Sequence, residues 1–106
     1  MQRDVFQAIA DPTRRAILGL VACQAMTPNT LATHFEMSRQ AVSKHIHLLS
    51  EAELVYAKPN GREVYYHLNP IRMKEVADWL APFQQLWESR FIQLDNVLQT
   101  LTEEKK

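Results

Sequence analysis

The sequence predicts a mainly α-helical chain that carries one small β-hairpin. Two observations support this prediction: apolar residues recur at helical spacing over most of the chain, and Asn60-Gly61 stands between two short runs of strand composition. The expected order is four helices, two strands and a last helix, in a single domain over residues 1–106. A short helix, a tight turn, a second helix and a hairpin together indicate a winged helix-turn-helix.

The first third of the chain predicts three helices. A short one, from Val5 to Ala10, ends at Asp11, which can cap a second helix from Pro12 to about Cys23. After a turn and cap at residues 27–29, a brief third helix is expected from Thr30 to Phe35. Glu36 and Met37 then form the tight turn.

The fourth predicted helix, residues 39–52, is amphipathic. Ser38 is its expected N-cap, and Val42, Ile46 and Leu49 recur at i, i+4 and i+7 as a buried stripe. The opposite front is polar and consists of Arg39, Gln40, Ser43, Lys44 and His47. These side chains are of the types that reach phosphates or base edges.

The hairpin is expected from residues 55–59 and 62–68, joined by the strongest short-range turn signal available. Asn69-Pro70 ends it. A long helical pattern then runs to about Leu101, and Pro82 is expected to kink or divide it.

Charge is distributed unevenly along a chain whose formal net charge is zero. The segments 38–47 and 58–62 contain bases and no acid, whereas many acids fall in the last third. This asymmetry predicts one basic face, and double-stranded DNA as its partner. The candidate DNA-binding residues are Ser38, Arg39, Gln40, Ser43, Lys44, His47, Lys58 and Arg62.

Two further side chains near these elements have more ordinary interpretations. His45 lies between the apolar stripe and the polar front, which favours a partly buried, hydrogen-bonded histidine over a base contact. Cys23 is the only cysteine; we expect it to pack as a small apolar residue, with redox sensing as the alternative. No metal site and no cofactor is predicted.

Composition also bounds the location and the class of the protein. The chain is 46% hydrophobic, yet it has no run of about eighteen apolar residues and its start carries charges, so we expect a cytoplasmic protein with no membrane partner. It has only two glycines and scattered acids, without a nucleophile triad, paired carboxylates or a glycine-rich loop. An enzyme is therefore not expected.

The last helix carries more apolar surface than a small domain covers by itself. Trp79, Phe83, Trp87 and Phe91 recur every four residues, and Leu94 and Leu98 extend the stripe. Part of this stripe suits an intramolecular core. A symmetric dimer seam explains the remainder better.

Three segments resemble the arsenic-repressor-like (ArsR/SmtB) family of bacterial repressors: IADPTRRAILGLV, LATHFEMSRQAVSKHIHLLSEAELV and GREVYYHLNP. The C-terminal VADWLAPFQQLWESRFIQLDNVL is similar to a subgroup without the usual metal sites. The resemblance implies a homodimeric DNA-binding repressor whose first and last helices form the interface, and so it adds Phe6 and Ile9 to the predicted dimer residues.

The sequence departs from that family pattern at two places. Neither the Cys-x-Cys pair nor the terminal-helix ligands of metal-sensing relatives are present, and His34 stands alone in its helix. Glu53 occupies a position where the family usually has glycine, so a left-handed residue there would be strained or replaced by another turn. The inducer stays unknown.

A second hypothesis is a winged-helix module that binds another protein and no longer binds DNA. Such a module would tend to lose the polar front of the fourth helix. Because Arg39, Gln40, Ser43 and Lys44 remain, the sequence favours DNA binding.

Overall fold

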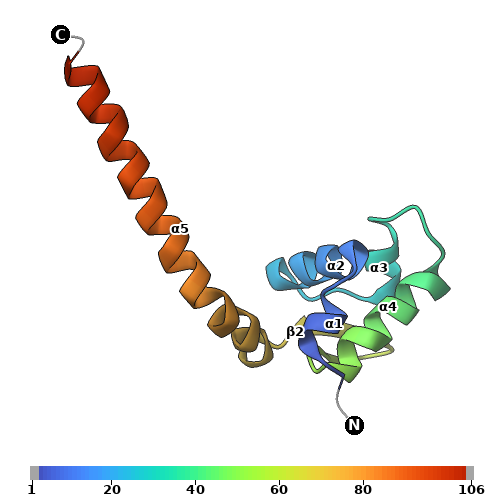
Figure 1. Cartoon of the computed structure of the whole chain (residues 1–106). Helices are drawn as coiled ribbons and strands as arrows, with labels where there is room; N and C mark the ends of the chain where they lie inside the picture. The colour runs from blue at the N-terminus through green and yellow to red at the C-terminus, as the bar shows by residue number, and fades with distance from the viewer. Residues whose placement is uncertain (1–2, 105–106) are drawn as a thin grey trace. The chain divides into compact units, whose positions relative to one another are not determined.

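A computed structural model describes residues 3–104, which divide after Val76 into two units. The first unit contains α1 (Val5–Ala8), α2 (Pro12–Cys23), α3 (Pro28–Ala32), α4 (Arg39–Glu51), β1 (Val55–Asn60), β2 (Glu63–Leu68) and the beginning of α5 (Pro70–Glu104) (Figure 1). The second unit is the remainder of α5. This order of elements confirms the predicted fold class.

Capping groups explain the boundary between α1 and α2. The Asp11 carboxylate accepts a hydrogen bond from the backbone N–H of Arg14 at 3.0 Å, and Pro12 occupies the first turn of α2. The Arg14 and Arg15 side chains donate to the carbonyls of Ala8 and Ile9, at 2.6 and 2.8 Å. They thereby satisfy carbonyl groups that a short helix leaves unpaired at its end.

The predicted bounds of α3 were wrong by two to three residues. The Thr27 hydroxyl accepts from the N–H of Thr30 at 3.1 Å, so Thr27 is the N-cap and Pro28 opens the helix. The amides of residues 33–35 bond to carbonyls three residues earlier, at 3.1–3.2 Å. That tighter pattern ends α3 at Ala32.

The first unit is built around one apolar core. From α4, Val42, Ile46 and Leu49 are buried, as predicted, against residues of the neighbouring elements. The remaining core residues are Val5, Ala8, Ile17, Leu18, Val21, Leu31, Ala52, Leu54 and Val55. Met73 and Val76, at the beginning of α5, pack against this core.

The backbone turns sharply between α4 and β1 at Glu53, where φ is 60°. Of the two outcomes expected at this position, the left-handed one is confirmed. Three hydrogen bonds hold the turn: the Asn69 side chain donates to the Glu53 carbonyl at 2.9 Å, the Asn69 amide to the Leu54 carbonyl at 2.8 Å, and the Arg72 side chain to the Ala52 carbonyl at 3.0 Å. They offset the strain of a non-glycine residue in this conformation.

The hairpin has its expected turn and a fixed root. Val55 pairs with Leu68 and Asn60 with Glu63, and Gly61 has a φ of 68°. On the other edge of β2, the Tyr66 amide donates to the Met26 carbonyl at 2.8 Å, and the Met26 amide donates back at 3.3 Å. The strand is therefore bonded on both sides near its root.

The second unit is one helical segment with many exposed apolar side chains. Pro82 lies inside α5 without interrupting it, so of the two outcomes expected at this proline, a kink or a division, the division was wrong. An interior proline removes one backbone hydrogen bond and crowds the carbonyl four residues earlier, but the adjacent turns are rich in good helix formers, which sustain the helix. The exposed residues include Trp79, Phe83, Leu86, Trp87, Phe91, Leu94, Leu98 and Leu101. Within residues 3–104, no helix is both long and apolar enough to cross a membrane.

Candidate nucleic-acid interface

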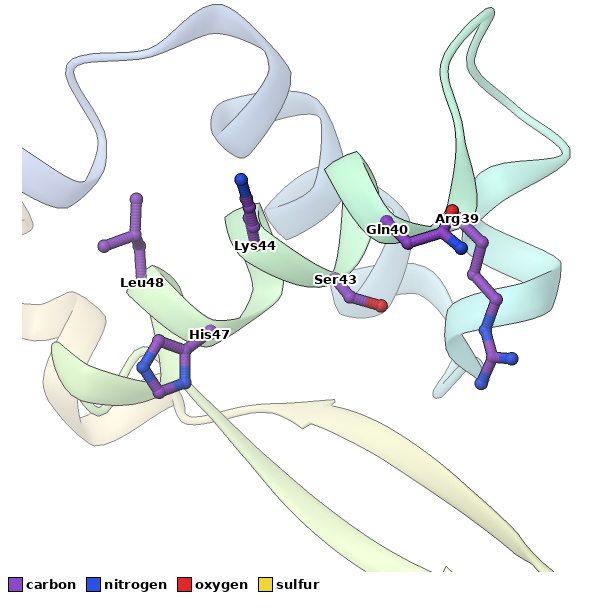
Figure 2. A pocket seen from close by; sticks show the side chains of 6 residues that line it. All are labelled: Arg39, Gln40, Ser43, Lys44, His47 and Leu48. Atoms are coloured by element: carbon purple, nitrogen blue, oxygen red, sulfur yellow. The ribbon is translucent and has the colours of Figure 1, made fainter.

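The outer face of α4 forms a shallow depression of about 550 Å³, opposite the buried stripe. Its lining residues are Arg39, Gln40, Ser43, Lys44, His47 and Leu48 (Figure 2). Ser43 and His47 project to one side of the helix, and Lys44 and Leu48 to the other. Because the opposite stripe is buried, the core fixes which way this face points.

The structure brings five of the eight predicted DNA-binding residues to this depression. Ser38 lies just before it and serves as the N-cap of α4, since its hydroxyl oxygen accepts from the Ala41 amide at 3.1 Å. Lys58 lies on β1 and Arg62 in the hairpin turn, so neither lines the depression. Leu48, which the sequence pattern did not mark as part of the surface, gives this face an apolar group.

Four cations of these elements are available to an external anion. Arg39 and Lys44 on α4, and Lys58 and Arg62 on the hairpin, are exposed. None of the four forms an ion pair with another residue among those described, 3–104. A chain of zero net charge therefore presents unneutralised positive charge on α4 and on the hairpin.

His47 differs from these cations because it has an acidic partner. Its Nε2 lies 2.6 Å from a carboxylate oxygen of Glu51, whose other oxygen pairs with Arg3. The hydrogen bond from Arg3 is the main cause that lowers the pKa of Glu51, and His47 adds to it. The same face of α4 therefore also carries an acid, since Glu51 lies one turn beyond His47.

A second depression, of about 730 Å³, lies between α4 and the hairpin. Ser43 and His47 border it from α4, and Tyr56, Ala57 and Tyr66 border it from the strands. Tyr56 is half exposed, and its ring stacks on His67 with centroids 5.3 Å apart. Because Ser43 and His47 line both depressions, the α4 face continues onto the hairpin.

His45 is partly buried, as expected, but it lacks the expected hydrogen bond. Its Nδ1 atom is buried and has no hydrogen-bond partner, and the closest carboxylate oxygen belongs to Asp11, 3.8 Å away.

Cys23 is exposed at the end of α2, so its predicted packing role was wrong. The described part of the chain holds no cluster of three or more His, Cys, Asp or Glu side chains that suits a metal ion.

The predicted dimer residues lie in both units. Phe6 and Ile9 are partly buried in the first unit. In the second unit Trp79, Phe83, Trp87, Phe91, Leu94 and Leu98 are all exposed, Phe91 to 66%. The Trp79 and Phe83 rings contact one another along the helix, with centroids 5.0 Å apart.

Comparison with known proteins identifies the class of protein that has this fold and surface. A family model described as a helix-turn-helix domain matches residues 9–55. The transcriptional repressor SdpR of Bacillus subtilis is 38% identical over 80 residues, which cover 76% of this chain and 89% of SdpR. An arsenical resistance operon repressor of Staphylococcus xylosus is 34% identical over 65 residues, or 61% of this chain and 62% of that repressor.

A solved structure agrees with these relatives. An ArsR-like transcriptional regulator from Rhodococcus sp. RHA1 superimposes with a TM-score of 0.66 at 30% identity, over 88% of each chain. The protein is thus a DNA-binding transcriptional regulator with a winged helix-turn-helix fold, and not an enzyme. It belongs to the ArsR family.

Proposed function

We propose that this regulator is a homodimeric cytoplasmic repressor that binds an inverted-repeat operator, with α4 in the major groove and the hairpin as a wing. The observation that carries the proposal is the outer face of α4. There Arg39 and Lys44 have no ion-pair partner among residues 3–104, and Gln40 and Ser43 line the same depression. The names of SdpR and the arsenical repressor support the repressor role.

The residues of this surface divide by chemistry into two roles. The Gln40 amide can donate to and accept from adenine, and Arg39 suits guanine or a phosphate. Lys44 and Lys58 are compact charges that suit phosphates, and Arg62, in the hairpin turn, suits a phosphate or the minor groove. His47 suits a phosphate, although Glu51 competes for its ring.

A dimer is supported by the apolar residues of the second unit. Trp87 and Phe91 are exposed to 49% and 66%, and leaving large aromatic side chains in water is unfavourable. A second copy of the chain offers the same surface under two-fold symmetry. Such a dimer presents two α4 helices roughly 34 Å apart, or a multiple of that spacing, and so requires an inverted repeat.

Selection of bound duplexes from a random library, followed by affinity measurement at several salt concentrations, tests the proposal. The enriched sequence is expected to contain two half-sites in inverted orientation. Phe91→Glu is expected to give monomers by sedimentation and to lose tight operator binding, whereas Gln24→Glu, which places the same charge on an exposed residue of the first unit, is expected to leave the dimer intact.

Two results would contradict the proposal. Enrichment of a single half-site would remove the dimeric mode. Failure to bind any selected duplex better than random DNA at low salt would favour the alternative, in which the winged helix binds another protein and not DNA.

A further inference from the structure

His45 on α4 lies close to Asp11, the N-cap of α2, although the two residues are 34 positions apart in the sequence. Their side chains are 23% and 32% exposed, so both are largely screened from water. The His45 Nδ1 atom is fully buried and makes no hydrogen bond, and the Asp11 Oδ2 atom lies 3.8 Å away. A buried polar atom without a hydrogen-bond partner lowers the stability of the fold. One that lies beside a carboxylate, a ready acceptor, therefore needs an explanation.

The charge state of the ring determines what this contact can be. A neutral imidazole can place its proton on Nε2, which leaves Nδ1 as an acceptor facing the oxygens of an anion. A protonated ring carries N–H groups on both nitrogens, so Nδ1–H points a donor toward Asp11. Closing the distance to that of a charge-assisted hydrogen bond takes a movement of only about 1 Å.

We propose that His45 and Asp11 form a proton-dependent latch, in which protonation of His45 binds α4 to the beginning of α2. The carboxylate is already held in place, because its Oδ2 atom accepts from the Arg14 amide at 3.0 Å. The latch therefore closes by movement of the histidine and its helix. In the neutral state the contact stays open and Nδ1 stays unsatisfied.

The other charged groups near the contact are bound elsewhere or exposed, so Asp11 is the partner of His45. From α2, the Arg14 and Arg15 guanidinium groups are bound to carbonyls at the end of α1. α3 contains no titratable side chain, and from β1 Tyr56 and Lys58 are exposed. On α4 itself, His47 pairs with Glu51, and Lys44 forms no ion pair with residues 3–104.

The pH window of the latch follows from the two groups. The Arg14 amide is the main cause that lowers the pKa of Asp11, with a further contribution from the charge of His45. A carboxyl with a lowered pKa contributes stability above its ordinary pKa and loses it as the pH falls through the lowered value. The latch therefore requires an ionised Asp11 together with a protonated His45, so it closes in mildly acidic solution and opens in alkaline solution.

A double-mutant cycle of urea unfolding without DNA tests the latch, using the wild type, Asp11→Asn, His45→Gln and the double variant at pH 5.5 and 8.0. Asn caps a helix as well as Asp, so the first substitution removes the charge and keeps the cap. At pH 5.5 the coupling between Asp11 and His45 is expected to change the equilibrium constant of unfolding at least about threefold. At pH 8.0 the coupling is expected to be absent. His34→Gln, which removes an exposed histidine, is the control for general pH effects.

Equal coupling at both pH values, or none at either, would overturn the proposal. If His45→Gln does not fold, nitrogen NMR of the imidazole in the wild type and in Asp11→Asn decides instead. His45 must lose its proton at a lower pH in Asp11→Asn, and unchanged titration would refute the latch. Because neither measurement uses DNA, failure of operator binding would leave the result intact.

Discussion

The side chain of Asn69 donates a hydrogen bond to the backbone carbonyl of Glu53 at 2.9 Å, which ties the end of the hairpin to the turn after α4. Glu53 holds a φ of 60°, a left-handed conformation that glycine adopts without a steric cost. The end of α4 is therefore fixed by a residue in a strained conformation and by the hydrogen bond that Asn69 donates to it.

Replacing Glu53 with glycine is expected to stabilise the protein. Relief of the left-handed strain gains about 1–2 kcal/mol, and the greater freedom of glycine in the unfolded chain returns up to about 1 kcal/mol. Urea unfolding should show a net gain of about 0.5–1 kcal/mol. Glu53→Ala removes the same charge but keeps a Cβ atom, so a gain of equal size in that control would refute strain as the cause.

Base contacts and phosphate contacts on the proposed surface are expected to separate by mutation. Gln40→Ala or Ser43→Ala should reduce discrimination between the operator and a scrambled duplex by about 1–3 kcal/mol. Lys44→Ala or Arg62→Ala should weaken both duplexes similarly and reduce the salt slope by about one. Titrations against salt measure both effects, with circular dichroism to check folding. If all four variants bind like the wild type, this surface does not contact DNA.

Glu51→Gln is expected to strengthen DNA binding. The substitution removes a negative charge beside His47 and frees Arg3, so affinity at low salt should rise by about threefold and the gain should fade as salt screens it. The lowered pKa of Glu51 keeps this carboxyl ionised below its usual range, and so the gain should persist in mildly acidic buffer. Glu75→Gln, which breaks a similar pair with Arg72 on α5, should change nothing. A loss of affinity in Glu51→Gln would instead show that Glu51 orients His47 for its phosphate.

Zinc, cadmium and arsenite are expected to leave operator affinity unchanged at stoichiometric concentrations. A metal sensor needs several Cys, His or carboxylate ligands that converge, and residues 3–104 contain no such cluster. Titration of each ion into the DNA complex, followed by fluorescence anisotropy, measures the effect. Tight one-to-one binding with release of DNA would mean that Cys23, His34 or His67 forms a site in another state of the protein.

Local signals predicted most of the fold. The spacing of Val42, Ile46 and Leu49 gave the buried side of α4, Ser38 gave its beginning, and Asn60-Gly61 placed the hairpin turn. These features depend on neighbours within about one turn of chain, so periodicity and capping chemistry suffice. The start of α3 was misplaced because Thr27 was assigned to a turn, although its spacing to Thr30 is that of a capping residue.

Contacts between distant positions could not be predicted in the same way. Arg3 meets Glu51 and Asp11 approaches His45 because tertiary packing brings these elements together. No local pattern marks either pair. The exposure of Cys23 has a similar origin, since the end of α2 alone does not show which of its sides the core covers.

The reciprocal hydrogen bonds between Met26 and Tyr66 attach the hairpin to the segment between α2 and α3. The bridge to Met26 holds the outer edge of β2 at Tyr66, near the root of the hairpin, and Gly61 lies at the opposite end, in the turn. Deuterium should therefore replace the amide proton of Tyr66 far more slowly than the amide protons near the tip. In the proposed complex with DNA, the few residues around Gly61 would adapt the wing to the groove, while Tyr66 would keep its position.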